Sequence, residues 1–335
     1  MYSDRGIDRL LDRTVALGYS QVGYAIRSRK WPAHDPGSNA LAGQNALVTG
    51  AGGGLGEATS LALARLGARV HLLVRNPERA GGAVERISAE LGRTGIVADL
   101  AVEQCDISSS ESIERFATDF VAGKKGKGQL DILVHNAGVM PPERLESMDG
   151  HELSLATHVL GPALLTERLL PVLKHSECGA RVILVSSGGM YTQPLETNDP
   201  EFNNGDYSGP VAYARTKRMQ VALTPFFDAR WKPADVSVYS MHPGWVDTPG
   251  IRESLPRFRT LTKPLLRSPD SGSDTTVWLA ATTERPPSGT FWHDRKQRPT
   301  KFWTAKETPA EDTEKLNSWV WETIESRTRG KRKTT

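Results

Sequence analysis

The sequence predicts an α/β fold in which a doubly wound parallel sheet is flanked by helices within a single domain. Short apolar runs rich in Val, Ile and Leu alternate with helical patterns through most of residues 44–295. That order is typical of βαβ units. The runs are nearly continuous in their apolar character, as expected for strands that are buried on both faces.

Six runs are candidate strands. The four strong ones are ALVTG (46–50), VHLLVR (70–75), DILVHNAG (131–138) and RVILVSS (181–187), and the weaker ones lie at 96–106 and 236–244. Helical patterns lie between them at 55–66, 77–92, 110–123, 150–174 and 211–230. Two stretches interrupt this order. Residues 189–210 are polar and rich in turn formers and are predicted to be a loop. Residues 247–272 carry the basic side chains Arg252, Arg257, Arg259, Lys263 and Arg267.

The composition limits the classes of function. The chain has 335 residues, of which 38% are hydrophobic and 24% charged, with a formal net charge of +3. These values indicate a globular protein, and the small net charge argues against a nucleic-acid-binding protein. Two cysteines, Cys105 and Cys178, have no partners at zinc-site spacing and indicate a reducing compartment. With no secretory signal or spanning segment seen, we expect a cytoplasmic protein without a metal site.

The first candidate strand runs into TGAGGGLG (49–56) and then into a helix. Glycines there allow positive φ and let backbone N–H groups approach a pyrophosphate, which the helix N-terminus also attracts. Placed between strand and helix, these glycines fit a dinucleotide fingerprint of the Rossmann type. The alternative is that they only make a turn.

The residue after the second strand bears on the choice of dinucleotide. NAD-specific sites place an acid there for the ribose hydroxyl, whereas this chain has Arg75, 19 residues after Gly56. An arginine suits a 2′-phosphate through charge-assisted hydrogen bonds. The sequence therefore favours NADP(H) over NAD(H), the alternative being an ordinary surface arginine. After the third strand, Asp106 either accepts from the adenine amino group or caps the next helix.

Tyr213 and Lys217 stand four residues apart in VAYARTK (211–217), so a helix places them on one face. A free phenol has a pKa near 10, a poor match to acid–base work at neutral pH. A neighbouring ammonium group, together with the positive nicotinamide of an oxidised cofactor, would stabilise the phenolate and lower this pKa. The alternative is that Tyr213 packs while Lys217 extends into solvent.

Together these residues resemble the short-chain dehydrogenase/reductase family. The pattern consists of TGxxxGxG at Thr49, Gly50, Gly54 and Gly56; NAG at Asn136, Ala137 and Gly138; Ser187 at a strand end; YxxxK at Tyr213 and Lys217; and PG-x-x-x-T at Pro243, Gly244 and Thr248. Longer phrases such as HPGWVDTPGI (242–251) are similar to one subgroup of the family. The resemblance covers roughly residues 44–295.

The resemblance implies an oxidoreductase that interconverts a carbonyl and an alcohol by hydride transfer with NADP(H). Tyr213 is the implied general acid or base, Lys217 its partner and a ligand of the nicotinamide ribose, and Ser187 the group that binds the substrate oxygen, with Ser186 as the alternative. The candidate cofactor-binding residues are Thr49, Gly50, Gly52, Gly54, Leu55, Gly56, Arg75, Asp106, Ile107, Asn136, Ala137, Gly138, Tyr213, Lys217, Pro243, Gly244, Val246 and Thr248.

One position departs from the family pattern. His158, in LATHVLGPALLT (155–166), stands where the family has an asparagine that helps to bind a relay water behind the lysine. A neutral imidazole can also hold a water, and a histidine ordinarily titrates near neutral pH. His158 is therefore placed in the candidate catalytic set, the alternative being a core histidine. Because of this departure, an alternative function is also considered: an NADPH-binding sensor or scaffold with little turnover.

The predicted organisation is an N-terminal helical extension (1–43), an NAD(P)-binding Rossmann catalytic domain (44–300), and a C-terminal helix with a basic tail (301–335). Residues 7–26 fit one amphipathic helix docked on the main domain, the alternative being a helix on a membrane surface. The expected partners are a small carbonyl or alcohol substrate, no nucleic acid, a peripheral membrane contact and a homodimer through helices 150–174 and 211–230. Met190 and Tyr191 are expected to lie beside the substrate pocket.

Overall fold

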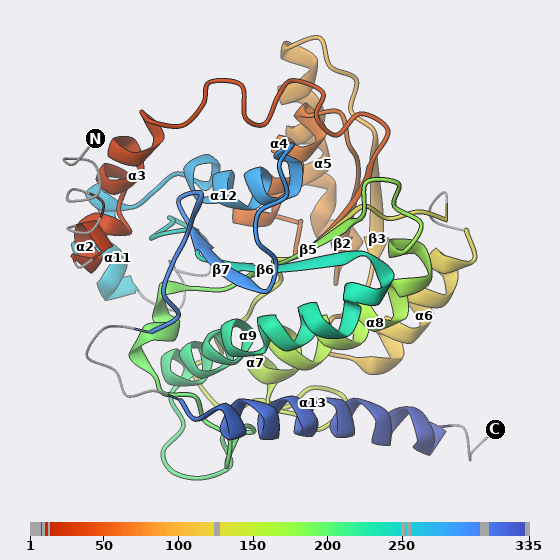
Figure 1. Cartoon of the computed structure of the whole chain (residues 1–335), viewed down its shortest axis with the longest axis vertical. Helices are drawn as coiled ribbons and strands as arrows, with labels where there is room; N and C mark the ends of the chain where they lie inside the picture. Colours follow the sequence, from red (N-terminus) through yellow and green to blue (C-terminus); the bar gives the residue numbers. More distant parts are fainter. Residues whose placement is uncertain are drawn as a thin grey trace.

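The computed structural model describes residues 8, 11–12, 14–123, 128–248, 252, 256–301 and 308–331. Its centre is an eight-stranded sheet in the order β3-β2-β1-β4-β5-β6-β7-β8 (Figure 1). The strands are β1 Asn45–Thr49, β2 Arg69–Val74, β3 Leu100–Gln104, β4 Ile132–His135, β5 Ala180–Val185, β6 Val236–Met241, β7 Thr290–His293 and β8 Lys296–Gln297. All neighbours pair in parallel except β7 and β8. The doubly wound α/β prediction is confirmed, and the chain reverses direction across the sheet between β1 and β4.

Helices cover both faces of the sheet, each over its own apolar core. One face carries α4 (Gly54–Arg65), α5 (Pro77–Arg93) and α12 (Pro269–Ala281), and the other carries α6 (Ser110–Val121), α8 (Gly161–Leu173) and α9 (Gly209–Trp231). The sequence does not predict β7, β8 or α12. The strands are only four and two residues long. Helix α12 buries small and hydroxylated side chains against α4, so it shows no apolar period.

The helix expected at 150–174 is irregular in its first half. It begins with α7 (Leu153–Leu155), continues as a π-helical segment (Ala156–Leu160) and only then becomes α8. Such π-helical turns occur frequently at functional sites. This one carries His158 and orients it toward α9.

The C-terminal helix α13 (Ala310–Lys331) packs on α9. Trp321 meets Phe227 and Trp231 edge-on, with ring centroids 5.9 and 6.3 Å apart, and the Arg230 guanidinium lies 3.8 Å from the Trp321 ring centroid. Helix α13 therefore covers part of a helix through which the homodimer is expected. The homodimer stays a prediction.

In the part of the N-terminal segment that the structure describes, α2 (Val15–Gly18) and α3 (Gln21–Ser28) are separate helices, so the prediction of one continuous helix is wrong. The break falls at Tyr19–Ser20, where the Ser20 hydroxyl accepts from Gly23 N and caps α3, a role that serine favours. The segment is docked on the main body, since Trp245 N donates to the Tyr19 carbonyl (2.8 Å).

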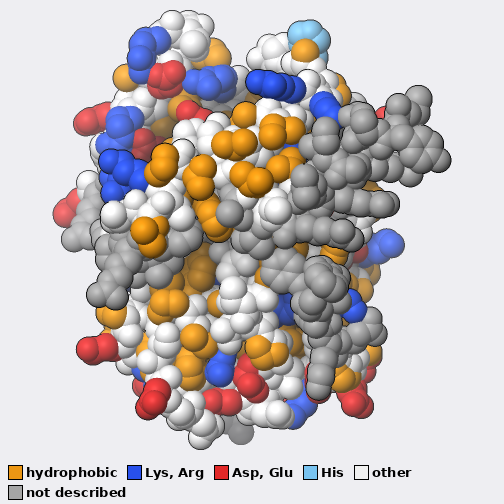
Figure 2. All heavy atoms as spheres, turned by 90° about the vertical axis from the view of Figure 1, so that its left-hand side faces the viewer, with side chains coloured by type: hydrophobic (Ala, Val, Ile, Leu, Met, Phe, Trp, Pro, Cys, Tyr) orange, Lys and Arg blue, Asp and Glu red, His pale blue; other side chains and the backbone are white. Residues whose placement is uncertain are grey.

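The molecular surface around the N-terminal segment carries both apolar and basic side chains. Figure 2 shows exposed apolar side chains beside Lys and Arg on this side of the molecule, and Leu17 and Val22 are each 44% exposed. Among the described residues, no helix has both the length and the apolar character needed to cross a bilayer. The peripheral membrane contact stays a prediction.

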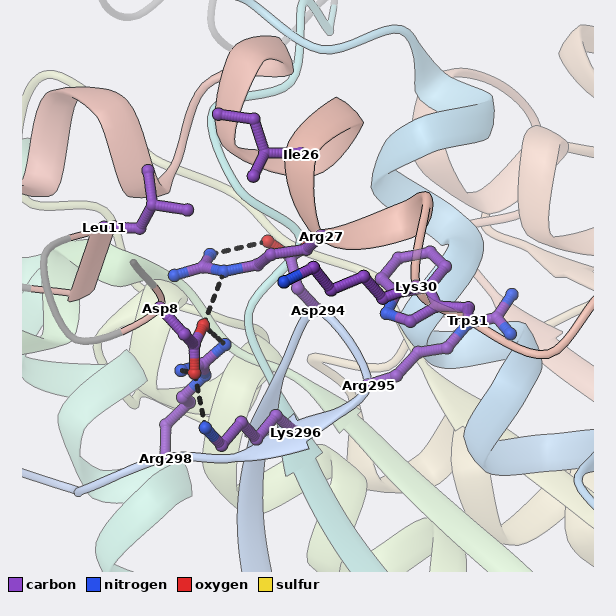
Figure 3. Close-up of a pocket in the computed structure, with 10 residues that line it drawn as sticks. All are labelled: Asp8, Leu11, Ile26, Arg27, Lys30, Trp31, Asp294, Arg295, Lys296 and Arg298. Carbon is purple, nitrogen blue, oxygen red and sulfur yellow. Dashed lines mark hydrogen bonds and ion pairs between the residues drawn. The ribbon is translucent and has the colours of Figure 1, made fainter. Parts of the chain in front are cut away.

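Buried ion pairs fasten the N-terminal segment to the β7–β8 turn. Asp294, 3% exposed, binds the Arg27 guanidinium from α3 (2.7 Å) and the Arg267 guanidinium (2.6 Å). Figure 3 shows Asp8 among Arg27, Arg298 and Lys296 beside the same turn. Burial alone raises the pKa of Asp294, but His293 and the two guanidinium groups outweigh it and hold that pKa well below its usual range.

Asp294→Asn is expected to lower the free energy of unfolding by about 3–5 kcal/mol, because it leaves the buried Arg267 guanidinium without its charge partner. It also removes one carboxylate from Arg27, which keeps Asp8 and Asp12. Asp99→Asn is the control. Asp99 forms an exposed, 3.7 Å pair with Arg69, and its loss should cost less than about 0.5 kcal/mol. Chemical denaturation of the two variants makes the comparison. Equal, small losses would show that the buried network does not hold the N-terminal segment.

Candidate active site

The turn between β1 and α4 forms an open cradle. Gly50 has φ +66°, and a Cβ on it would lie 2.8 Å from Ala137 Cα, so the turn requires glycine. Helix α4 has no side-chain cap at its N-cap, Gly53, and a Cβ there would meet nothing within 4 Å. The first-turn N–H groups of α4 are thus available to an anion.

Thr49 and Asn136 join the cradle to the neighbouring strand. The Thr49 hydroxyl accepts from Asn136 N (3.0 Å) and Ala137 N (2.9 Å), and the Asn136 side chain donates to the Thr49 carbonyl (3.0 Å). A Cβ on Gly56 would lie 2.5 Å from the Asn136 amide nitrogen. Four residues of the predicted cofactor set therefore fix the ends of β1 and β4 relative to α4.

The outer part of the predicted cofactor set lies at the ends of β2 and β3. Arg75 follows β2 and is exposed, with no acidic residue at the strand end. Asp106 accepts from the backbone N and hydroxyl of Ser108 (2.9 and 2.7 Å), while Ser109 caps α6. The capping alternative for Asp106 is therefore wrong, and its contact with adenine stays a prediction.

Other residues of the predicted cofactor set lie near the carboxyl ends of the strands, in the apolar core or in the loop after β6. Ile107 is 6% exposed and packs in the apolar core. Val246 and Leu55 both lie against Gly272 of α12, which brings the loop after β6 next to α4. Gly244 has φ +83° beside the Arg267 side chain. The loop after β6 thus reaches the same cradle as the first glycines.

Ser187 and Ser186 have different surroundings. Ser187 lies just beyond β5, half-buried, and its hydroxyl accepts from Gly189 N (3.2 Å) and hydrogen-bonds toward the Tyr213 phenol. Ser186 is 2% exposed and donates to the Lys217 carbonyl (2.9 Å). The Ser186 hydroxyl is thus engaged within the protein, which leaves Ser187 as the serine that faces the phenol.

Tyr213 and Lys217 lie on one face of α9, with the Lys217 Nζ 5.5 Å from the Tyr213 ring centroid. Lys217 is 2% exposed, and its Nζ donates to the Val185 carbonyl (2.7 Å). Burial lowers the pKa of Lys217 to about 7. Burial raises the pKa of Tyr213, and the hydrogen bond with Ser187 opposes that rise without cancelling it. The free protein therefore holds the phenol protonated and ready to donate.

His158 is fully buried and both of its ring nitrogens are bonded to protein. Val139 N donates to Nε2 (3.0 Å), so the proton lies on Nδ1, which donates to the Thr216 hydroxyl (2.8 Å). Thr216 in turn donates to the Tyr213 carbonyl (2.9 Å), and the His158 ring meets the Tyr213 ring edge-on at 5.3 Å. In this arrangement the imidazole has no nitrogen left for a relay water.

The near-neutral titration expected for His158 is wrong. Burial, with the nearby Lys217 charge, lowers the pKa of His158 well below its usual value. Its main-chain carbonyl is also taken, by the Gln220 side chain (2.7 Å). His158 therefore stays neutral at working pH and positions the Tyr213 ring.

Met190 and Tyr191 contact segments on the C-terminal side of the sheet, and their nearness to the substrate pocket stays a prediction. Met190 is fully buried against Val221 and Phe291, so its side chain is covered within the protein. The Tyr191 hydroxyl donates to the Pro299 carbonyl (2.5 Å). These contacts come from segments distant in the sequence, which local patterns do not reveal.

Sequence reasoning also missed two residues that contact the site. Thr216 stands inside the YxxxK motif, where its spacing from His158 gives no signal. His242 stands directly before the Pro–Gly element, and its side chain accepts from Gly188 N and Gly244 N. The only available signal was its adjacency to Pro243.

Comparison with known proteins agrees with this geometry. The sequence model for short chain dehydrogenases matches residues 44–257. The chain belongs to the short-chain dehydrogenase family. Dehydrogenase/reductase SDR family member 12 of Bos taurus is 40% identical over 305 residues, which are 89% of this chain and 91% of that protein. Retinol dehydrogenase 11 of Mus musculus is 32% identical over 249 residues, 72% of this chain and 74% of that protein.

Among solved structures, an uncharacterized protein from Mycobacterium paratuberculosis matches with a TM-score of 0.63 at 25% identity. The match covers 89% of this chain and 97% of that one. The short-chain dehydrogenase identity and the likeness to SDR family member 12 confirm the resemblance stated from the motifs. As a short-chain dehydrogenase, the chain is an oxidoreductase of the kind that acts on CH–OH and C=O groups.

The buried Lys217 makes stability depend on pH. A lysine whose pKa is lowered by folding binds fewer protons in the folded than in the unfolded state, so the free energy of unfolding rises with pH above the folded pKa. With a folded pKa of about 7, we expect a gain of about 1.5 kcal/mol from about pH 7 to about pH 8.5.

The measurement is urea denaturation of the cofactor-free protein across this pH range. Lys217→Met removes the titrating group and should give a nearly flat profile over the same range. The same slope in both proteins would assign the effect to another group and show that Lys217 is not buried as described.

Proposed function

We propose that this chain is an NADP(H)-dependent carbonyl reductase or alcohol dehydrogenase with Tyr213 as its general acid or base. The single observation that carries the proposal is the convergence of Ser187, Tyr213 and Lys217 beside the glycine cradle at the carboxyl edge of a parallel sheet. Ligands of open α/β sheets bind at this edge, next to the reversal of strand order.

The protein residues account for the proton transfer. In the reduction, Ser187 donates a hydrogen bond to the substrate oxygen and stabilises negative charge as it develops there. Tyr213, protonated in the free protein, gives its proton to the same oxygen. Lys217 lies close enough to favour the phenolate that remains. In the oxidation the same groups act in reverse.

The cradle fits a dinucleotide, because an uncapped helix N-terminus and a glycine without neighbours face open space there. We propose that Gly50, Gly54 and the first turn of α4 hold the pyrophosphate and that Lys217 holds the nicotinamide ribose. NADP(H) bound in this way supplies or accepts the hydride. The 2′-phosphate is assigned to Arg75, an exposed residue that directly follows β2, where NAD-specific sites carry an acid.

For the substrate we propose a lipophilic carbonyl compound or alcohol. One relative of the chain is a retinol dehydrogenase, a name that indicates a lipophilic alcohol for that protein. Near the loop after β6, Leu261 is 82% exposed, and Leu17 and Val22 lie exposed on the N-terminal segment. These apolar side chains favour a lipophilic rather than a charged substrate.

A second function is favoured by the surroundings of His158. Both ring nitrogens and the main-chain carbonyl of His158 are bonded to protein, so this residue offers no free atom to a relay water. Proton supply to Lys217 from that side is thereby restricted. The alternative is an NADPH-binding sensor or scaffold with little turnover, which would bind NADPH tightly without consuming it.

Tyr213→Phe is expected to lower turnover about 100- to 10,000-fold, because it removes the proton donor, while NADPH affinity stays within threefold. NADPH consumption with a pooled set of aldehydes, ketones, retinoids and steroids measures it. Tyr239→Phe is the matched control, since that hydroxyl bonds to the Pro286 carbonyl away from the site. If Tyr213→Phe retained turnover, the assignment of Tyr213 would be refuted.

Arg75→Ala is expected to raise the Kd for NADPH about 10- to 100-fold through the loss of charge-assisted bonds to the 2′-phosphate, and to change the Kd for NADH less than threefold. Arg69→Ala is the control, because Arg69 begins the same strand at its opposite end. Fluorescence titration with both dinucleotides gives the ratio. An unchanged NADPH-to-NADH ratio would remove Arg75 from the cofactor site.

A further inference from the structure

A buried histidine stands between the two loops that the proposed mechanism needs. His242 follows β6 and is 2% exposed. Burial, with His293 and Arg267 nearby, lowers the pKa of His242 well below its usual value, so the ring is neutral. Its position is set by tertiary structure, and the chemistry described above gives it no task.

The His242 ring joins the loop after β5 to the loop after β6. Its Nδ1 accepts from Gly188 N (3.0 Å) and from Gly244 N (3.2 Å). Two donors at Nδ1 place the ring proton on Nε2, for which the described residues provide no acceptor. A buried donor without an acceptor carries a cost, which the two bonds at Nδ1 offset.

Both joined loops belong to the proposed site. Gly188 follows Ser187, the residue assigned to the substrate oxygen, and Gly244 belongs to the Pro–Gly element assigned to the cofactor. A single acceptor atom thus fixes the distance between the two loops. Displacement of that atom would move the serine relative to the cofactor side, and misplacement of reacting groups by about 1 Å can cost about 100-fold in rate.

Aromatic rings hold His242 in place. His293, at the end of β7, stacks on it with centroids 4.6 Å apart and an interplanar angle of 20°. Tyr19 of the N-terminal segment meets it edge-on at 4.3 Å. The space is closed, because a Cβ on Gly188 would lie 2.8 Å from both His242 Nε2 and Tyr19 Cε2.

Tyr19 is itself anchored by three successive carbonyl groups. The Gly18 carbonyl accepts from Arg27 and Arg267, at 3.0 and 3.2 Å. The Tyr19 carbonyl accepts from Trp245 N (2.8 Å), and the Ser20 carbonyl accepts from Arg267 Nε (3.2 Å). Because the carbonyl groups of residues 18–20 all accept hydrogen bonds, the backbone of this segment is fixed against the ends of β6 and β7. The position of the Tyr19 ring is fixed with it.

We propose that His242 is a positioning residue that holds the Ser187 loop and the Pro–Gly loop in register, and that Tyr19 of the N-terminal segment keeps it in place. The inference rests on the proposed function, because it takes these two loops as parts of the reacting site. In this proposal the N-terminal segment contributes to the geometry of the active site.

The first test compares His242→Leu with His242→Asn. Leucine removes the acceptor, whereas the asparagine oxygen branches from the same carbon as Nδ1 and can accept both N–H groups. For His242→Leu we expect kcat to fall about tenfold or more, with KM for the carbonyl substrate and Kd for NADPH within threefold. His242→Asn should keep kcat within about threefold. Equal losses in the two variants would overturn the proposal.

Hydrogen exchange gives a readout that does not depend on turnover. Amides in peptides covering 186–192 and 243–248 should exchange at least tenfold faster in His242→Leu, and peptides from 45–104 should be unchanged. His242→Asn should resemble the unmodified protein. Unchanged exchange at both loops would overturn the proposal, whereas local loss of protection in a protein without any turnover would refute the proposed function alone.

Tyr19→Ala and Tyr19→Phe test whether the N-terminal segment holds His242 in place. These variants can be measured even if His242→Leu does not fold. Tyr19→Phe keeps the ring that packs on His242 and should retain kcat within twofold. Tyr19→Ala should reproduce the kcat loss and the faster exchange at 186–192 and 243–248. If Tyr19→Ala left both quantities unchanged, the N-terminal segment would have no part in positioning the site.

Discussion

The candidate active site depends on a reciprocal connection between helix α9 and the end of strand β5. Lys217 Nζ donates to the Val185 carbonyl, and the Ser186 hydroxyl donates to the Lys217 carbonyl. Both bonds are buried, and breaking either leaves an unpaired polar group that costs about 1–3 kcal/mol. Two bonds in opposite directions fix the helix against sliding and rotation. Tyr213 lies one helical turn before Lys217 and Ser187 directly follows Ser186, so the same two bonds set the phenol opposite the serine hydroxyl.

Segments outside the central strand–helix units also contact the sheet edge that carries this site. The region matched by the short-chain dehydrogenase model begins at residue 44, yet the backbone of residues 18–20 contacts the ends of β6 and β7. Asp294 holds this arrangement together by binding arginines from both sides. The buried charges are stable because each has its partner, and removal of a partner is costly. The N-terminal segment is thus part of the same electrostatic unit as the β7–β8 turn.

The features predicted correctly from the sequence are those encoded locally. Strand–glycine–helix order and the i, i+4 spacing of Tyr213 and Lys217 are short-range patterns, and they located the sheet, the cradle and the pair on α9. The features that were missed depend on residues distant in the sequence. Met190 belongs to the core because Phe291 and Val221 cover it. His158 loses its near-neutral titration because burial and the nearby Lys217 charge lower its pKa. His242 gains its position from Tyr19 and His293. No local pattern encodes these contacts.

Hydride transfer to a carbonyl at this site is best tested by isotope transfer. The protein would be incubated with NADPH that carries deuterium at the transferable position of the nicotinamide ring, together with aldehydes, ketones, retinoids and steroids. Mass spectrometry of the products then shows whether any alcohol has gained one deuterium. We expect a deuterated alcohol from at least one lipophilic carbonyl compound. Tight NADPH binding with no deuterated product from any of these compounds would contradict this expectation.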